Sequence, residues 1–327
     1  MRIAVLGSGS WGTALAILLG RNGHEVRLLA RDPEEVASIE RCRENLRYLP
    51  GFAIPASVGP GLVGESFEAD LAVVAVPSGA VRAVAAHLPS GDPLLLVASK
   101  GLEAATGRFM ADVLLEARPG SRVGVLSGPN LAVEIARGIP TVALSAFAAR
   151  TDAERVQAAF TNAAFRVSIT DDVVGVELAG ALKNVLAIGG GMSDGLGYGD
   201  NTKGAFLARG LMEMARLGAA MGARADTFLG PAGVGDLFAT ANSRLSRNYR
   251  VGAALGRGAR LDEAIAEVGQ TAEGVPTSEA AAILARRHGV ETPVFAAVAG
   301  VLQGRIAPRQ AVAMLMERAP RMDDFLA

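Results

Sequence analysis

The N-terminal segment carries a glycine motif whose flanking pattern strongly limits the possible folds. The sequence GSGSWG stands between an apolar strand and a helix, and a second strand follows. In this setting Gly7 permits a tight turn, Gly9 lets the backbone approach a pyrophosphate, and Gly12 lets helix and strand pack closely. The free N–H groups at the helix N-terminus suit a phosphate. The pattern therefore predicts a dinucleotide-binding fold. Its expected elements are a strand at 2–6, a helix at 13–21 and a strand at 25–30.

The end of the second strand bears on which dinucleotide is bound. An NAD-specific site usually has an acid there, which binds the ribose 2′-hydroxyl. Here Ala30 stands near that place, and Arg31 and Asp32 follow it. Arg31 could contact a 2′-phosphate, so we expect NADPH to be accepted. An ordinary solvated arginine is the alternative, and Asp32 keeps NADH open.

The alternation of strands and helices continues through the first half of the chain. Buried parallel strands are expected because the apolar runs are continuous rather than alternating. Lys100 ends one of these runs, and the loop 127–130, which contains Asn130, ends another before a helix at 131–137. Ligands bind at the carboxyl ends of such strands. The further expected strands are 70–77, 94–100, 123–126, 141–145 and 165–169.

From about residue 171 the strand pattern stops and helical periodicity replaces it. We therefore predict a Rossmann-type, doubly wound parallel sheet over residues 1–171 and an all-helical substrate domain over 172–327. The expected helices are 172–192, 203–222, 249–256, 261–268, 277–288, 294–302 and 308–317.

The first of these helices is apolar on nearly every face and contains Lys183. A helix of this kind is buried. No acid stands three or four residues from Lys183, so no local ion pair explains its charge. Burial lowers the pKa of an ammonium and makes it a usable acid or base near neutral pH. The alternative is that the side chain extends along its stem to the surface.

Two later loops combine residues that suit a phosphate or a reacting group. The loop 230–237, GPAGVGDL, is rich in glycine and contains Asp236. Ser246, Arg247 and Asn248 immediately precede a helix, which places a hydroxyl, a guanidinium and an amide beside free backbone N–H groups. A simple helix cap by Ser246 or Asn248 is the alternative.

The composition excludes several other classes of protein. The net charge of −1 gives no basic surface for nucleic acid. One cysteine, Cys42, allows no internal disulfide, and three scattered histidines make no structural zinc set, so we expect no metal. No signal peptide pattern precedes the first strand, and the apolar runs are interrupted before membrane-spanning length. We expect a cytoplasmic protein without a membrane span.

Seven blocks of the sequence resemble one family in the order in which that family has them. They are GSGSWGTALA, VASKGLE, SGPNLAVEIA, GALKNVLAIGGGMSDGLGYGDNTKGA, GPAGVGDLFAT, SRNYRVG and AEGVPT. Over essentially its whole length the chain resembles the bacterial NAD(P)-dependent glycerol-3-phosphate dehydrogenases. The resemblance implies reversible reduction of dihydroxyacetone phosphate to sn-glycerol 3-phosphate, which supplies glycerophospholipid synthesis, and it implies a homodimer.

The resemblance also implies roles for individual residues. Lys183 would exchange the proton with the carbonyl oxygen, Asp236 would orient Lys183 or the substrate hydroxyl, and Lys100 would contact substrate and nicotinamide. The substrate-binding residues would be Lys100, Gly128, Asn130, Lys183, Asp236, Ser246, Arg247 and Asn248. The cofactor-binding residues would be Gly7, Gly9, Ser10, Trp11, Gly12, Arg31, Lys100, Ala132, Arg247, Glu273 and Val275. The family often has a hydroxyl residue at the position of Asn130.

Two alternatives share the expected architecture. A 3-hydroxyisobutyrate or 6-phosphogluconate dehydrogenase also combines a Rossmann domain, a helical domain and a catalytic lysine. Its carboxylate substrate would occupy the basic site, but the loops at 230–237 and 246–248 argue against it. A dinucleotide sensor without catalysis would leave the lysine in the apolar helix unexplained.

Overall fold

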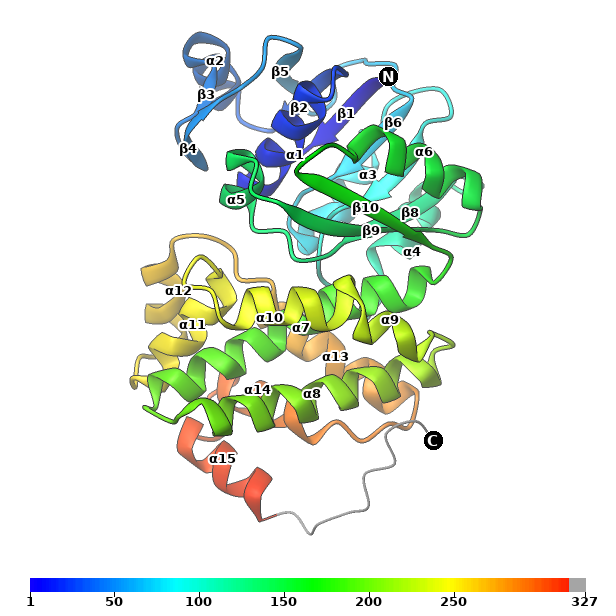
Figure 1. Ribbon diagram of the computed structural model, residues 1–327. Helices are drawn as coiled ribbons and strands as arrows, with labels where there is room; N and C mark the ends of the chain where they lie inside the picture. Colours follow the sequence, from blue (N-terminus) through cyan, green and yellow to red (C-terminus); the bar gives the residue numbers. More distant parts are fainter. Residues whose placement is uncertain (318–327) are drawn as a thin grey trace. The chain divides into compact units, whose positions relative to one another are not determined.

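The computed structural model describes residues 1–317, and the chain forms two compact units. The first unit comprises Met1–Ser99 and Met110–Val173. Among the described residues, the second comprises Lys100–Phe109 and the chain from Val174 on. The chain therefore enters the second unit for one short segment before it completes the first. The ribbon drawing shows an α/β unit and a helical unit (Figure 1).

The first unit is built on a sheet of eight strands. The strands are β1 (Arg2–Leu6), β2 (Glu25–Ala30), β5 (Val58–Leu62), β6 (Leu71–Val74), β7 (Leu94–Val97), β8 (Val123–Ser127), β9 (Thr141–Phe147) and β10 (Phe165–Thr170), in the order β10-β9-β8-β7-β6-β1-β2-β5. All neighbours are parallel except β8 and β9, which pair antiparallel. The predicted doubly wound, mainly parallel sheet is confirmed, and the antiparallel pair is a local difference.

Helices cover both faces of this sheet. Helices α1, α5 and α6 pack together on one face, while α3 and α4 pack together on the other (Figure 1). Strands β6 and β7 are buried along their whole length, which explains their unbroken apolar sequences. The helices of this unit are α1 (Ser10–Arg21), α2 (Pro33–Cys42), α3 (Val81–Ala85), α4 (Met110–Ala117), α5 (Ala132–Arg137) and α6 (Arg150–Phe160).

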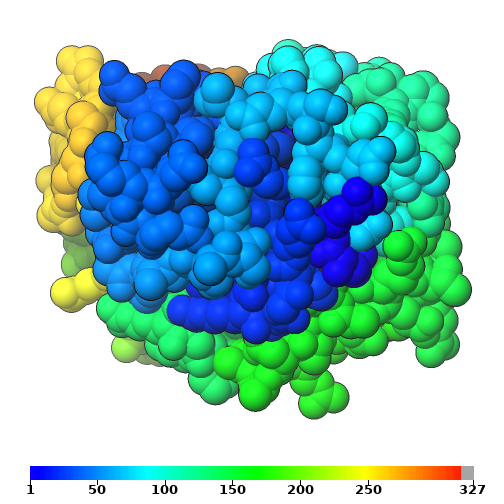
Figure 2. Space-filling view, turned by 90° about the horizontal axis from the view of Figure 1, so that it is seen from above, coloured from blue at the N-terminus to red at the C-terminus, as the bar shows by residue number. Residues whose placement is uncertain are grey.

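The region between β2 and β6 contains elements that the sequence pattern did not indicate. Helix α2 leads into a small antiparallel pair, β3 (Glu44–Asn45) and β4 (Leu49–Ala53), and then into β5. Strand β5 has the sequence VGPGL, whose proline and glycines are tolerated because it is an edge strand. The space-filling view shows one face of this unit, where the blue N-terminal segment lies beside the cyan segment that follows it (Figure 2).

The second unit is helical. Its helices are α7 (Val173–Gly195), α8 (Asp200–Ala220), α9 (Ala225–Leu229), α10 (Asp236–Ala241), α11 (Arg247–Gly256), α12 (Leu261–Val268), α13 (Gly274–Arg287), α14 (Pro293–Leu302) and α15 (Pro308–Met316). Glycines let α7 and α11 approach closely: a Cβ on Gly191 would lie 2.1 Å from the Tyr249 carbonyl oxygen, and one on Gly252 would lie 1.9 Å from that of Ile188. This contact fixes the start of α11 against the middle of α7.

Helix α7 is the central helix of this unit, as its sequence predicts. Every residue from Gly175 to Ser193 is buried. Among the described residues it is the one helix long and apolar enough to cross a membrane, and 89% of its apolar window is buried inside the protein. Burial of that extent is typical of a core helix.

Candidate active site

Lys183 is held inside the second unit by two side chains of α10. Its side chain is 7% exposed, and its Nζ donates to Asp236 Oδ1 at 3.0 Å and to Thr240 Oγ1 at 2.7 Å. The side chain therefore does not extend to the surface, which was the alternative interpretation of Lys183. Burial lowers the pKa of Lys183 to about 8, although the Asp236 carboxylate opposes the shift.

Asp236 lies between two ammonium groups. Lys100 Nζ is 2.6 Å from Oδ2, while Lys183 binds Oδ1. Burial by itself raises the pKa of Asp236, but the charges of the two lysines outweigh it and the pKa is lowered. The carboxylate is therefore ionised, and the three charged groups together carry one net positive charge. Such a group suits a substrate that is negatively charged or gains negative charge on oxygen.

Local structure explains why these side chains meet. A short π-helical turn, Pro231–Gly235, leads directly into α10 and places Asp236 at its first residue. Only glycine fits at 233, because a Cβ there would lie 2.0 Å from the Phe228 carbonyl oxygen. Thr240 follows Asp236 by four residues, so both side chains lie on one face of α10. The glycines of this loop thus position the carboxylate.

Three backbone segments are joined to α7 by a chain of side-chain amides. Asn184 Nδ2 donates to the Lys100 carbonyl at 3.1 Å, and Asn184 Oδ1 accepts from Asn248 Nδ2 at 2.9 Å. Asn248 Oδ1 in turn accepts from the backbone N–H of Gly274 at 2.9 Å. This chain ties the segment at Lys100, the start of α11 and the start of α13 to the residue beside Lys183.

The predicted phosphate loop forms the start of α11. Ser246 is the N-cap, and its hydroxyl accepts from the Tyr249 N–H at 3.2 Å, as the capping interpretation expects. Arg247 is the first residue of the helix and is half-buried. Burial lowers its pKa, whereas the negative charge of Glu273 opposes the shift. The charge of Arg247 also lowers the pKa of Lys183, so the guanidinium belongs to the surroundings of that lysine.

In the first unit, the glycine loop has the geometry that a pyrophosphate needs. Gly7 has φ +113°, and a Cβ there would lie 2.7 Å from the Ala75 carbonyl oxygen; one on Gly12 would lie 1.9 Å from that of Gly7. A Cβ on Gly9 would meet nothing within 4 Å. Ser10 begins α1, whose N-cap Gly9 supplies no side-chain bond to the first N–H groups. The residues present therefore fit a dinucleotide phosphate.

The other cofactor residues expected in the first unit occupy distinct positions. Trp11 donates from Nε1 to the Ala98 carbonyl at 2.9 Å, which fixes its ring against the end of β7. Arg31 is exposed just beyond β2, and Ala132 is the first residue of α5. Glu273 and Val275 stand at the N-terminus of α13, in the second unit.

Asn130 presents a buried oxygen without a partner. Its Nδ2 donates to the Val142 carbonyl at 3.2 Å, but its Oδ1 has no hydrogen bond among the described residues. Gly128, with φ +147°, makes the turn that brings this amide into place, and a Cβ on it would lie 3.4 Å from Asn130 Oδ1. The unpaired oxygen is an acceptor ready for a ligand donor.

Sequence reasoning missed two residues of the lysine cluster. Thr240 bonds to both Lys183 and Asp236, and its spacing of four residues from Asp236 on a helix was the available signal. Asn184 is the first member of the chain of side-chain amides described above. Its polar side chain, next to Lys183 in an otherwise apolar helix, was the available signal. Strand β7 is also shorter than expected: it ends at Val97, three residues before Lys100.

Comparison with known proteins shows the family to which the chain belongs. The family model described as NAD-dependent glycerol-3-phosphate dehydrogenase N-terminus matches residues 2–153, and the corresponding C-terminus model matches residues 172–313. The chain belongs to the NAD-dependent glycerol-3-phosphate dehydrogenase family. This membership confirms the resemblance stated from the sequence blocks, and with it an oxidoreductase that uses NAD(P).

Individual relatives support the same conclusion. The chain is 46% identical to the glycerol-3-phosphate dehydrogenase [NAD(P)+] of Pseudomonas fluorescens, over 99% of this chain and 97% of that protein. It is 44% identical to that of Pelodictyon phaeoclathratiforme, over 97% and 98%. The crystal structure of glycerol-3-phosphate dehydrogenase from Coxiella burnetii matches with a TM-score of 0.92 at 35% identity, over 97% and 99% of the two chains. A ketopantoate reductase from Ralstonia eutropha, at 18% identity, shares only the fold.

Proposed function

We propose that this protein reduces dihydroxyacetone phosphate reversibly to sn-glycerol 3-phosphate. The observation that carries the proposal is Lys183, a buried ammonium whose Nζ is held by a carboxylate and a hydroxyl on one helix. The printed name of the relatives, glycerol-3-phosphate dehydrogenase [NAD(P)+], supplies the substrate. When bound, the nicotinamide supplies the hydride that the carbonyl carbon receives.

Lys183 delivers the proton in this proposal. As the carbonyl carbon gains a hydride, its oxygen gains negative charge and takes the proton from Lys183 Nζ, which becomes a neutral amine. Asp236 keeps the ammonium oriented and stabilises it before transfer, and Lys100 adds positive charge beside the developing oxyanion. In the reverse direction the neutral amine of Lys183 accepts the hydroxyl proton. Lys100, Lys183 and Asp236 are the proposed catalytic residues.

The start of α11 binds the substrate phosphate in this proposal. Arg247 supplies a charged donor, and the backbone N–H groups at the helix start supply further donors. Ser246 and Asn248 use their side chains to hold this loop, so their contribution to the phosphate comes mainly through positioning. The unpaired Oδ1 of Asn130, with Gly128 beside it, is the proposed acceptor for a substrate hydroxyl.

The cofactor is held by the glycine loop of the first unit. Gly7, Gly9 and Gly12 shape the loop, and the uncapped start of α1 at Ser10 binds the pyrophosphate. The further proposed cofactor residues are Trp11, Arg31, Lys100, Ala132, Arg247, Glu273 and Val275.

A substrate comparison tests the function. Oxidation of NADH and of NADPH is followed by the loss of nicotinamide absorbance, with dihydroxyacetone phosphate and separately with unphosphorylated dihydroxyacetone. We expect turnover with the phosphate ester and little without the phosphate. Cofactor binding without turnover of either compound would instead favour the sensor, and turnover of hydroxy acids alone would favour a carboxylate-specific relative.

Two lysine variants distinguish loss of the proton donor from the general effect of removing a buried lysine. Lys183→Met should lower kcat by about 10²–10⁴-fold, the usual effect of losing a general acid, while the cofactor still binds. Lys203 is the matched control, because it is also a buried lysine, ion-paired with Asp194 at 2.8 Å. Lys203→Met should keep kcat within a few-fold even if the protein loses stability. An unchanged kcat in Lys183→Met would remove Lys183 from the mechanism.

The assembly and the cellular role complete the proposal. We propose a cytoplasmic homodimer that supplies sn-glycerol 3-phosphate for glycerophospholipid synthesis, in line with the resemblance. Light scattering of the purified protein tests the dimer: a mass of one chain at micromolar concentration would exclude it.

A further inference from the structure

The chain uses lysine at only three positions. Of its 32 lysine and arginine residues, three are lysine: Lys100, Lys183 and Lys203. Their side chains are 14%, 7% and 10% exposed, and each is ion-paired with an aspartate of the second unit. Lysine and arginine are not interchangeable, because an ammonium is compact whereas a guanidinium is a planar fork. Lys100 and Lys183 belong to the candidate active site, so the third lysine needs an explanation of its own.

Lys203 binds Asp194 across the connection between α7 and α8. Its Nζ donates to Asp194 Oδ2 at 2.8 Å. Asp194 lies in the last turn of α7, and Lys203 is the fourth residue of α8. The helix dipole disfavours a carboxylate at a C-terminus and an ammonium at an N-terminus, so neither charge is placed to stabilise its own helix. The two helices by themselves therefore do not account for this pair.

The third member of the group is Tyr249 of α11. Its hydroxyl donates to the same Asp194 oxygen at 2.7 Å, and Lys203 Nζ lies 5.2 Å from the centre of its ring. Partial burial and the bond to Asp194 raise the pKa of Tyr249, so the hydroxyl stays protonated and acts as the donor. The main chain of Tyr249 also contacts α7, at Gly191. In Figure 1 the end of α7, the start of α8 and α11 lie at the same end of the helical unit.

Tyr249 stands in the turn that carries the proposed phosphate-binding residues. It follows Arg247 by two residues in the first turn of α11, and its N–H donates to the cap residue Ser246. A helix has about 3.6 residues per turn, so residues two apart point to nearly opposite sides. Tyr249 therefore anchors this turn on the side away from Arg247. Without the anchor, the turn and Arg247 with it would be free to shift.

We propose that Lys203 is a positioning residue for the substrate phosphate. Through Asp194 and Tyr249 it fixes the first turn of α11, so that Arg247 and the N–H groups beside it are in place before the phosphate arrives. Donors that are ordered in advance bind more tightly, because the cost of ordering them is not subtracted from the binding free energy. The inference rests on the phosphate site of the proposed function and adds three residues that act through it.

Two substrates separate a phosphate effect from a general loss of folding. Reduction of dihydroxyacetone phosphate and of unphosphorylated dihydroxyacetone is measured for the wild type, Lys203→Met and Tyr249→Phe. We expect the KM for the phosphate ester to rise about tenfold in Lys203→Met and about threefold in Tyr249→Phe, which loses one hydrogen bond. Removal of uniform binding leaves kcat within a few-fold, so Lys203→Met also serves as the control for Lys183→Met. The value of kcat/KM for dihydroxyacetone should not change.

Arg257→Met is the matched control for the ion pair. Arg257 is the exposed C-cap of α11 and pairs with Glu267 of α12 at 3.4 Å, so the variant breaks an ion pair of the same helix at its other end. It should leave KM unchanged for both compounds. Calorimetric titration with inorganic phosphate gives a readout without turnover. Its Kd should rise about tenfold in Lys203→Met and stay unchanged in Arg257→Met.

An unchanged KM for dihydroxyacetone phosphate in both Lys203→Met and Tyr249→Phe would overturn the proposal. So would an equal loss of kcat/KM for the two substrates, because the group would then only support the folded protein. Failure of the proposed function has a different signature: the wild type would not turn over dihydroxyacetone phosphate, while the Kd for inorganic phosphate would still respond to Lys203.

Discussion

The ammonium of Lys183 lies 2.7 Å from the hydroxyl oxygen of Thr240. That hydroxyl accepts from the lysine and donates to Asp236 Oδ1 at 3.1 Å, so one side chain sets the geometry of both charged groups. A hydrogen bond to the charged form of a buried lysine stabilises that form. Thr240 therefore supports the protonated state that reduction of a carbonyl requires.

Replacing Thr240 tests this support. Thr240→Val keeps the shape but removes the hydroxyl, so the pKa of Lys183 should fall further and kcat for reduction should decrease by about tenfold. The measurement is kcat against pH for the variant and the wild type. Thr240→Ser restores the hydroxyl and should recover most of the activity. If the pH profile of Thr240→Val were unshifted, the role of Thr240 would be restricted to side-chain packing.

The pH dependence of the two reaction directions should be opposite. The pKa of Lys183 is lowered to about 8, mainly by burial. Reduction needs the ammonium, so its rate should fall as the pH rises through about 8; oxidation needs the neutral amine, so its rate should rise over the same range. Initial rates at saturating substrate in both directions check this. Parallel profiles in the two directions would contradict a single acid–base group.

Two glycine variants should separate cofactor binding from folding. Gly9→Ala places a methyl group in open space, so the protein should stay folded while its affinity for the cofactor falls about tenfold or more. Gly12→Ala places its Cβ 1.9 Å from the Gly7 carbonyl oxygen, so it should lower the melting temperature as well. Thermal unfolding and cofactor titration of both variants provide the comparison. Normal cofactor affinity in folded Gly9→Ala would mean that the pyrophosphate binds elsewhere.

A buried glutamate should make the stability of the protein depend on pH. Glu213 of α8 accepts from the Val294 and Phe295 N–H groups at the start of α14. Burial raises its pKa from 4.5 to about 7, although these hydrogen bonds oppose the shift. Between these two pKa values the unfolded chain loses the proton while the folded protein keeps it. The free energy of unfolding should therefore fall by up to about 3 kcal/mol as the pH rises from 4.5 to 7.

Glu213→Gln isolates this contribution. The variant keeps an acceptor for the helix N–H groups but cannot ionise, so its stability should lose that part of the pH dependence. Urea unfolding at several pH values measures it. Equal slopes in the variant and the wild type would show that Glu213 is ionised in the folded protein throughout this range.

The sequence was most informative where local pattern and tertiary structure agree. The glycine motif predicted the β1–α1–β2 unit, and the apolar run around Lys183 predicted a buried helix, because each pattern has one dominant structural solution. Strand β5 was not predicted, because Pro60 and two glycines break the strand pattern. Its backbone pairing with β2 stabilises the strand despite these residues. The partners of Lys183 could not be predicted from its neighbours, since Asp236 is 53 residues away and Lys100 lies far upstream.

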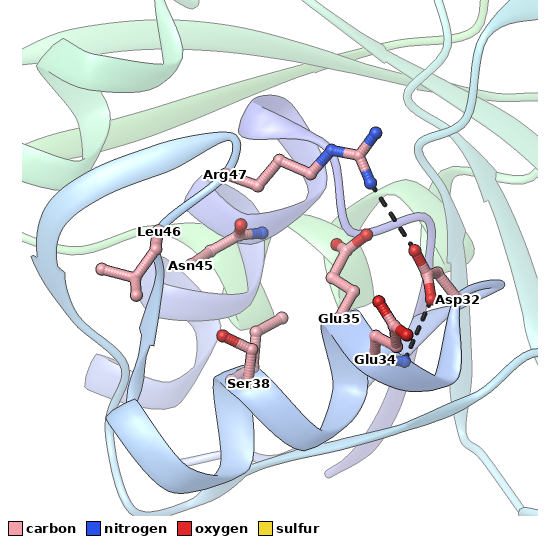
Figure 3. Close-up of a pocket in the computed structure, with 8 residues that line it drawn as sticks. Asp32, Glu34, Glu35, Ser38, Asn45, Leu46 and Arg47 are labelled. Carbon is pink, nitrogen blue, oxygen red and sulfur yellow. Dashed lines mark hydrogen bonds and ion pairs between the residues drawn. The ribbon is translucent and has the colours of Figure 1, made fainter.

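The local sequence pattern also could not predict roles that depend on side-chain partners distant in the chain. The sequence placed Asn248 in a phosphate loop, but its amide bonds Asn184 and Gly274, residues distant in the chain. Similarly, the sequence left NADH open because of Asp32, and only the structure reveals that Asp32 caps α2 and lies 3.6 Å from an Arg47 nitrogen (Figure 3). Such competition for hydrogen bonds is decided by the folded chain as a whole.

The membership of Lys100–Phe109 in the second unit has a consequence for recombination between relatives. An exchange at the single junction after residue 173 would transfer every helix of the second unit but would keep Lys100 from the original gene. Asp236 from one parent would then pair with Lys100 from the other parent. A chimera that takes the whole helical unit from one parent consequently needs two donor fragments, because the unit is discontinuous in the sequence.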